Sequence, residues 1–162
     1  MNFHKRQILV FSLAMMTFIA WAHEGKHHPK SNTQEKTSFV QINELYLTDV
    51  KPIFEKKCFD CHGSSSSSAW YRNVPGAKQL IDSDIKESKE HLDMSSDFPF
   101  KSHATPLEDL DAIQSSIDKN EMPPFRYRIM HSDSTLTTVE KEKVSKWVQF
   151  GKEILKVKQT NQ

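Results

Sequence analysis

Residues 58–62 read CFDCH and contain both cysteines of the 162-residue chain, Cys58 and Cys61, with His62 directly after the second. Two thiols at this spacing have four common uses: a disulfide, half of a zinc site, a thiol redox pair, or the attachment of a haem. Each use makes a different demand on the rest of the chain. The surrounding sequence therefore decides between them.

Three of the four readings find little support elsewhere in the sequence. Structural zinc needs four ligands, usually in two pairs, whereas His91, His103 and His131 are scattered singly. A thiol redox pair is typical of the start of a helix after a strand, and no segment here alternates cleanly between apolar and polar residues. A disulfide closing so small a loop would add little stability.

The attachment of a haem accounts for all five residues. In a c-type haem the two thiols form thioethers with the porphyrin vinyl groups, and the adjacent histidine binds the iron from the proximal side. The motif therefore predicts one covalently attached haem c, held by Cys58, Cys61 and His62.

The N-terminal residues meet a further requirement, because this attachment is carried out after export. Lys5 and Arg6 precede 13 uncharged residues, and Ala20-Trp21-Ala22 offers small residues at the positions that a signal peptidase reads. We predict a signal peptide over residues 1–22, cleaved before His23, and a periplasmic or secreted protein. The alternative is an uncleaved anchor, but the apolar run is shorter than the ~20 residues of a spanning helix.

The remaining 140 residues (162 less 22) carry 20 basic side chains (22 less Lys5 and Arg6) and 21 acidic ones. This balance argues against nucleic acid or an anionic membrane as the main partner. We expect redox proteins as partners, and no stable membrane insertion after cleavage. The oligomeric state is left open.

A chain of this length suggests one domain. Residues 23–38 contain almost nothing apolar and are predicted to be a disordered leader. Histidines in such a segment are more often solvated than metal-binding, which applies to His23, His27 and His28. We predict a cytochrome c-like domain over residues 39–158 and a flexible tail over residues 159–162.

The expected fold is all-α, with short helices and long loops wrapped around one haem. A short helix should run from a cap at Asp49 into the cysteines, with Pro52 in its first turn. GSSSSSA after His62 is read as a loop and NVPG at 73–76 as a turn.

Three further helices are expected. Apolar spacing indicates one over residues 84–92, followed by irregular structure over residues 95–104. Capping boxes formed by Thr105 with Glu108 and by Thr137 with Glu140 predict helices over residues 106–120 and 138–156.

A haem iron held by histidine on one side raises the question of its opposite ligand. Met122 lies in NEMPPF, directly after the expected 106–120 helix, and two prolines stiffen this loop. A preordered thioether is well suited to binding haem iron and gives an electron carrier. Met94 and Met130 are alternatives, and a bis-histidine haem could use His91, His103 or His131.

The order of these segments carries a resemblance. CFDCH, WYRNVP, DIKESKEHLDMS, EMPPFRYRIMH and LTTVEKEKVSKWV together resemble the haem-binding domain family of exported bacterial proteins, over about residues 40–150. The resemblance implies a monohaem c-type cytochrome, with Cys58, Cys61 and His62 in the attachment and proximal roles and Met122 in the distal role. Ser88, where glycine is expected, and Met94, where an aromatic residue is expected, depart from the pattern.

Residues around the haem are expected to support it. The ring nitrogen of His62 that does not bind iron should donate its N–H to a backbone carbonyl. The turn at Val74-Pro75 is a candidate for this acceptor. Other side chains could pack on the porphyrin or bind its propionates, or could serve the core or surface in the ordinary way: Trp70, Tyr71, Phe125, Tyr127, Arg72, Arg126 and Arg128.

These features predict an exported monohaem c-type cytochrome that carries single electrons and is not an enzyme. One alternative is a haem enzyme, or a gas or peroxide sensor, in which Met122 is exchangeable. Glu121 and Arg126 are available for such chemistry, but nothing in the sequence places them over the iron. Another alternative is an interaction module whose haem is structural.

Overall fold

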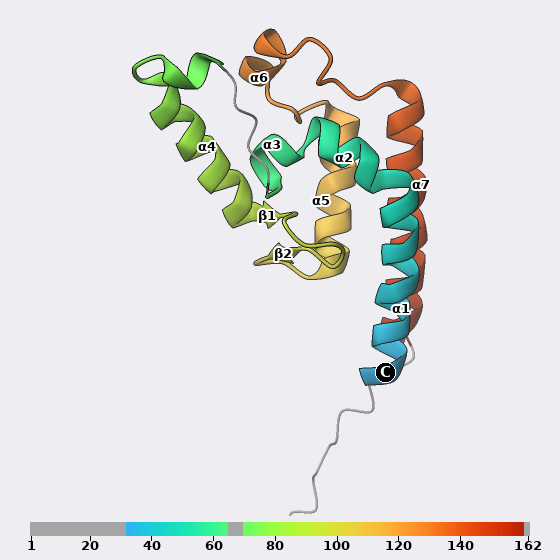
Figure 1. Ribbon diagram of the computed structural model, residues 1–162. Coiled ribbons are helices and arrows are strands. Elements are labelled where there is room, and N and C mark those ends of the chain that lie inside the picture. Colours follow the sequence, from blue (N-terminus) through green and yellow to red (C-terminus); the bar gives the residue numbers. More distant parts are fainter. Residues whose placement is uncertain (1–31, 65–69, 161–162) are drawn as a thin grey trace, which may run out of the picture. The chain divides into compact units, whose positions relative to one another are not determined.

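Helices make up most of the computed structural model, which describes residues 32–64 and 70–160 (Figure 1). The expected all-α class is confirmed. The expected signal peptide, residues 23–31 of the leader, most of the serine run and residues 161–162 lie outside the described residues. In chain order the elements are α1 Asn32–Leu45, η1 Tyr46–Val50, α2 Lys51–Lys57, α3 Phe59–His62, η2 Trp70–Asn73, α4 Ala77–His91, β1 Leu92–Asp93, β2 Lys101–Ser102, α5 Pro106–Lys119, α6 Phe125–Met130 and α7 Thr138–Thr160.

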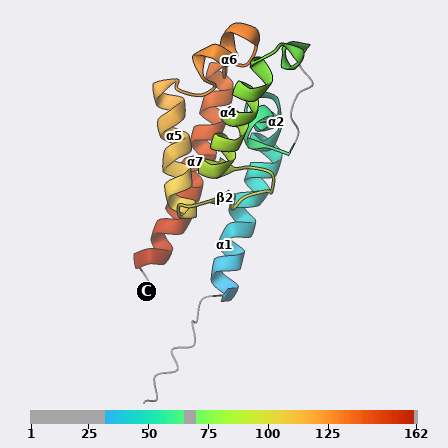
Figure 2. The ribbon, with the colours of Figure 1, turned by 90° about the vertical axis from the view of Figure 1, so that its left-hand side faces the viewer.

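The main apolar core lies where α1, η1 and α5 pack against α7 (Figure 2). Trp147 of α7 is fully buried at its centre, and its indole Nε1 donates a hydrogen bond to the carbonyl oxygen of Ile42 at 3.1 Å. Four rings surround the indole at centroid distances of 5.5–6.2 Å: Tyr46, Phe54, Phe98 and Phe100. Aromatic burial on this scale dominates the energetics of a small core.

Both expected capping boxes are confirmed. At the start of α5, the Thr105 hydroxyl accepts from the Glu108 N–H and the Glu108 carboxylate accepts from the Thr105 N–H. Thr137 and Glu140 exchange the same pair of bonds before α7. Each box satisfies N–H groups that the first helical turn leaves without intrahelical partners.

Helix α4 begins earlier than expected. It covers Ala77–His91 rather than residues 84–92, because the NVPG turn leads straight into it. Gly76 closes that turn with a φ of 84°, a conformation that side chains with a Cβ rarely adopt. Helix α4 therefore runs for 15 residues, and it contacts α3.

Helices extend past the predicted bounds of the domain at both ends. Helix α1 begins at Asn32, so residues 32–38 are helical rather than part of a disordered leader. Helix α7 continues to Thr160, so residues 159–160 do not belong to a flexible tail. Once a helix is anchored by packing, polar residues extend it at one added hydrogen bond per residue.

The expected cap at Asp49 was wrong as well. Asp49 lies inside the π-helical turn η1, and no side chain caps α2, although Pro52 does occupy its first turn. The region expected to be irregular, residues 95–104, contains β2, which pairs with β1 in antiparallel fashion so that Ser102 faces Leu92. The segment between these strands inserts Met94, Phe98 and Phe100 into the core.

Fully buried side chains are unevenly distributed along the chain. The core residues come mainly from α1, η1, α2, α5, α7 and the segment between β1 and β2. By contrast, α3, η2, α4 and α6 bury no residue completely. Of these four elements, α3 is part of CFDCH itself, and α4 and α6 contact it. No helix among the described residues is long and apolar enough to cross a membrane.

Candidate haem-binding site

The CFDCH segment forms a tight helical turn. Cys58 ends α2 and precedes α3, and its carbonyl oxygen accepts hydrogen bonds from the N–H groups of Cys61 at 3.2 Å and His62 at 3.0 Å. The three predicted site residues are therefore brought together on one turn. Both cysteines are half-buried, and neither is in a disulfide.

The two thiols are uncharged at neutral pH. Burial, and then the neighbouring Cys61, raise the pKa of Cys58 to about 12, and burial likewise raises the pKa of Cys61. Zinc binding and thiol–disulfide exchange both use thiolates, which this environment disfavours. Within residues 32–64 and 70–160, no group of three or more His, Cys, Asp or Glu side chains is arranged to hold a metal ion.

The imidazole of His62 has a fixed orientation. Its Nδ1 lies 2.8 Å from the carbonyl oxygen of Leu92, which requires Nδ1 to carry the proton and leaves Nε2 as the atom with a free lone pair. Burial lowers the pKa of His62, which keeps the ring neutral. A neutral imidazole held by a carbonyl on one nitrogen is the usual form of a metal-ligating histidine.

The expected carbonyl partner is confirmed, but its predicted location was wrong. The acceptor belongs to Leu92 in β1, not to the turn at Val74-Pro75. The same segment also holds the His62 backbone, because the Met94 N–H donates to the His62 carbonyl oxygen at 2.8 Å. No sequence signal marks such an acceptor, since every residue has a backbone carbonyl.

The glycine after the motif has a steric role. A Cβ at Gly63 would lie only 2.5 Å from Cγ of Phe59, whose ring packs against the exit of the turn. The chain can leave CFDCH in this direction only if position 63 has no side chain. The predicted loop after His62 thus begins with a glycine, and the packing of Phe59 requires that this position has no side chain.

Met122 lies in the segment between α5 and α6. Helix α5 ends at Lys119, Asn120 adopts a left-handed conformation with a φ of 54°, and the peptide bond between Met122 and Pro123 is cis. The Met122 side chain is 49% exposed. Helix α6 begins three residues later.

Two contacts attach α6 to the elements around CFDCH. The Tyr127 hydroxyl donates to the Asp60 carboxylate at 2.5 Å, and Asp60 lies between the two cysteines. Arg126 pairs with Asp84 of α4 at 2.5 Å. The structure therefore brings α6, which follows Met122 closely, to the CFDCH turn and to α4. Asp60 was missed by the sequence analysis, because no pattern marks it.

The alternative iron ligands have other surroundings. Met94 is buried in the main core, and His91 and His103 are exposed. His131 stacks on Tyr127 with ring centroids 4.1 Å apart, and its Nε2 lies 2.5 Å from the Tyr71 hydroxyl. Tyr71 and Tyr127 thus meet at His131 and join η2 to α6, a link that the sequence did not reveal.

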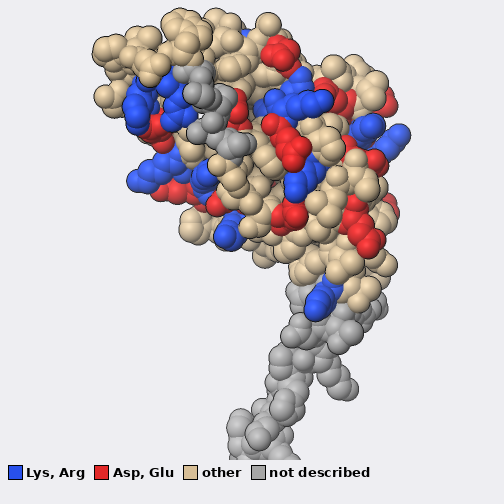
Figure 3. All heavy atoms as spheres, viewed as in Figure 1, with Lys and Arg blue, Asp and Glu red and all other residues tan. Residues whose placement is uncertain are grey.

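Large apolar side chains remain exposed on the elements around the turn. In the view of Figure 3 the uppermost surface, over η2 and α6, is largely free of charged side chains. An exposed apolar surface of this kind marks a binding site for an apolar partner or cofactor, and a flat porphyrin fits the requirement. The exposed residues are Trp70, Val74, Leu80, Met122, Phe125, Ile129 and Met130.

Two of the three predicted propionate partners are engaged with protein carboxylates. Arg72 pairs with Asp82 at 2.7 Å, and Arg126 pairs with Asp84. Both aspartates belong to α4, so Arg72 ties η2 to α4 and Arg126 ties α6 to α4. Their availability for a cofactor carboxylate is correspondingly reduced.

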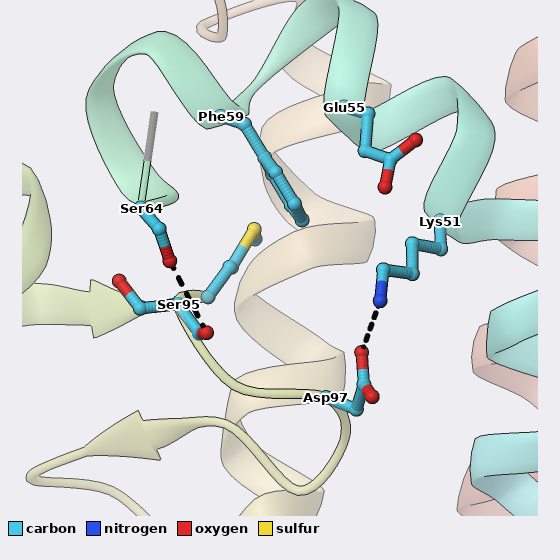
Figure 4. A pocket seen from close by; sticks show the side chains of 7 residues that line it. Lys51, Glu55, Phe59, Ser64, Ser95 and Asp97 are labelled. Atoms are coloured by element: carbon cyan, nitrogen blue, oxygen red, sulfur yellow. Dashed lines mark hydrogen bonds and ion pairs between the residues drawn. The ribbon is translucent and has the colours of Figure 1, made fainter. Parts of the chain in front are cut away.

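A separate pocket of about 380 Å³ lies beside Phe59 (Figure 4). Lys51 and Asp97 form an ion pair of 2.8 Å at one side, and Ser64 donates to the Ser95 carbonyl oxygen at the other. The lining includes neither cysteine and does not include His62. The charge of Lys51 is matched by Asp97, and Phe59 is the CFDCH residue that lines this pocket.

The comparisons with known proteins identify the family of this chain. The haem-binding domain family matches residues 12–150, and the chain belongs to that family. It is therefore a haem protein, which confirms that the cofactor is a haem. Cytochrome c peroxidase Ccp of Escherichia coli (strain K12) is 30% identical over 135 residues, which are 79% of this chain and 27% of that protein. The chain thus matches about a quarter of this relative's length. No solved structure gave a significant match.

Proposed function

We propose that this chain is a monohaem c-type cytochrome that transfers single electrons. Cys58 and Cys61 form the thioethers, His62 is the proximal ligand and Met122 the distal ligand. The observation that carries the proposal is the fixed, neutral His62 ring, held through Nδ1 by the Leu92 carbonyl at 2.8 Å next to two uncharged thiols. A bound haem supplies an iron that gains or loses one electron without any bond being broken.

The protein's contribution is to position and shield this group. The Leu92 carbonyl orients His62, and the bond between Tyr127 and Asp60 holds the segment after Met122 near the same turn. The apolar side chains of η2, α4 and α6 would exclude water from the porphyrin. A rigid, water-poor site lowers the reorganisation that accompanies electron transfer.

The cellular setting is part of the proposal. Thioether formation after export requires the signal peptide predicted over residues 1–22, so we place the protein in the periplasm or outside the cell. Its partners are redox proteins rather than nucleic acid. The near-balanced charge of the chain supports this choice.

A second candidate is a peroxide-reacting haem enzyme, and the similarity to a cytochrome c peroxidase favours it. The half-exposed Met122 side chain would then have to leave the iron. The match extends over 27% of that peroxidase, so the likeness leaves most of that protein without a counterpart here. Arg126, which the sequence offered for such chemistry, is already paired with Asp84.

The attachment is tested by expressing the full chain, with its signal peptide, in a bacterium that matures c-type cytochromes. The alkaline pyridine spectrum of the denatured protein reports how many vinyl groups have become thioethers. We expect the two-thioether spectrum for the wild type and the one-thioether spectrum for Cys58→Ser and for Cys61→Ser. A wild-type spectrum of unmodified haem would contradict the attachment.

The same preparation distinguishes an electron-transfer cytochrome from a peroxide-reacting haem enzyme. The reduced protein is exposed to CO and the oxidised protein to hydrogen peroxide. A carrier with a stable distal ligand should show no fast spectral change with either reagent. Rapid CO binding together with turnover of peroxide would favour the second candidate.

A further inference from the structure

Arg128 differs from the other two arginines near the site. Arg72 and Arg126 each form an ion pair with an aspartate, at 2.7 and 2.5 Å. Arg128 takes part in none of the ion pairs among the described residues. Its Nε is nevertheless buried, and no hydrogen-bond acceptor lies within reach of it.

The guanidinium of Arg128 is held in place by its own helix. Its Cζ lies 6.0 Å from the centroid of the Phe125 ring, one turn earlier in α6. A cation over an aromatic face is partly stabilised, but this contact supplies no acceptor for the N–H groups. The side chain is therefore oriented while its buried Nε–H has no acceptor in the protein.

Such an arrangement is costly unless a ligand completes it. A buried donor without a partner costs about 1–3 kcal/mol, and more when the group is charged. The guanidinium prefers a carboxylate, which it can bind through two parallel hydrogen bonds. The missing partner is therefore expected to be an anion with carboxylate geometry.

The position of α6 identifies the carboxylate. Tyr127, the residue before Arg128, is bonded to Asp60 between the two cysteines, so α6 borders the turn on which a haem would be attached. A haem carries two propionate carboxylates. The acidic side chains that tie these elements together, Asp60, Asp82 and Asp84, are already engaged by Tyr127, Arg72 and Arg126.

We propose that Arg128 binds a haem propionate and thereby orients the porphyrin and raises its reduction potential. This inference rests on the proposed haem attachment to CFDCH. A positive charge beside the porphyrin favours the reduced iron, which carries one positive charge fewer than the oxidised iron. Arg128 is thus a positioning residue for the cofactor.

The test compares Arg128→Gln, Arg128→Lys and Arg126→Gln in the full, haem-loaded protein. Arg126→Gln is the matched control, because it removes an arginine from the same helix that already has a protein partner. The readouts are the midpoint potential and the propionate-bending band in the resonance Raman spectrum, which responds to hydrogen bonding at the propionate.

We expect Arg128→Gln to lower the midpoint potential and shift the propionate band, while Arg126→Gln leaves the band unchanged. Arg128→Lys should keep the potential close to that of the wild type, because the charge remains, but shift the band. If the Arg128→Gln protein does not fold in sufficient amounts, the Arg128→Lys protein alone tests whether Arg128 bonds a propionate. An unchanged band in that variant would overturn the inference.

Other results would also overturn it. An Arg128→Gln protein with attached haem but an unchanged potential and band has no bond to a propionate. If Arg128→Gln alters only the rate of reaction with anionic ferricyanide, the arginine serves a carboxylate of an external partner instead. A wild-type protein without attached haem would refute the proposed function itself, which the pyridine spectrum shows separately.

Discussion

The hydroxyl of Tyr127 donates a hydrogen bond to the carboxylate of Asp60, and this bond joins the helix after Met122 to the residue between Cys58 and Cys61. The two partners are 67 residues apart in the sequence. Burial, and then Asp60 itself, raise the pKa of Tyr127 far above its ordinary value, so the hydroxyl keeps its proton. The bond therefore links the segments that carry the two proposed axial ligands.

Removal of this hydroxyl should loosen the distal side of the site. We expect Tyr127→Phe to lower the free energy of unfolding by about 1.5–3 kcal/mol, as for the loss of a hydrogen bond to a charged group. The reduced protein should also bind CO faster. Tyr71→Phe is the control, because it removes a hydroxyl from the same cluster without breaking the bond to Asp60. Equal CO binding rates in the two variants would contradict the role given to Asp60.

Removal of the haem should affect one half of the domain more than the other. In a Cys58→Ser/Cys61→Ser double variant prepared without haem, amide hydrogens of α4 and α6 are expected to exchange rapidly. Neither helix has a fully buried residue of its own, so each depends on an apolar partner. Hydrogen-exchange mass spectrometry should still find α5 and α7 protected around Trp147. Protection of α4 and α6 that does not change on haem removal would contradict this division.

The main core should depend strongly on Trp147. We expect Trp147→Ala to lower the free energy of unfolding by about 3–5 kcal/mol, because it removes a fully buried indole and leaves a cavity. Phe150→Ala on the same helix is the control, since Phe150 is 37% exposed and should cost well below that range. Urea unfolding followed by circular dichroism measures both. Similar losses for the two variants would be inconsistent with the observed core.

Asp109 should make stability depend on pH. Its carboxylate is 3% exposed and accepts a hydrogen bond from the Ser102 hydroxyl at 2.9 Å, and burial raises its pKa. A carboxyl with a raised folded-state pKa is stabilising when protonated, and that stability is lost as the pH rises above the unfolded-state pKa of about 3.9. Asp109→Asn removes the charge and keeps an acceptor for Ser102.

The Asp109→Asn protein should therefore be more stable than the wild type at about pH 7, and the difference should shrink toward about pH 4. Urea midpoints at the two pH values measure this. A difference that is constant with pH, or that grows as the pH falls, would show that the carboxylate is not destabilised by burial.

The parts of the site that depend on local sequence could be predicted. CFDCH places its three side chains on one turn because helical geometry fixes the spacing of nearby residues, and the capping boxes of Thr105 and Thr137 act within four residues. The candidate cofactor follows from the same local chemistry. Family membership then confirmed the haem.

The parts that depend on packing could not be predicted. The Leu92 carbonyl that orients His62 is a backbone group, and only the fold brings it to the imidazole. The pairing of Arg126 with Asp84, and the absence of such a pair for Arg128, depend on how α6 packs against α4. Likewise, the start of α1 at Asn32 follows from helix propagation beyond the packed residues, which polar sequence does not reveal.

The central claim is that Met122 binds the haem iron opposite His62, and Met130 provides a closely matched control. Both side chains are 49% exposed; Met122 precedes α6 and Met130 is the last residue of α6. The most direct measurement is the weak far-red absorption band that a methionine sulfur bound to ferric haem iron produces. We expect the band in the wild type and in Met130→Leu, and its loss in Met122→Leu together with rapid CO binding by the reduced protein. A wild type without the band, or a Met122→Leu protein that retains it, would contradict the assignment.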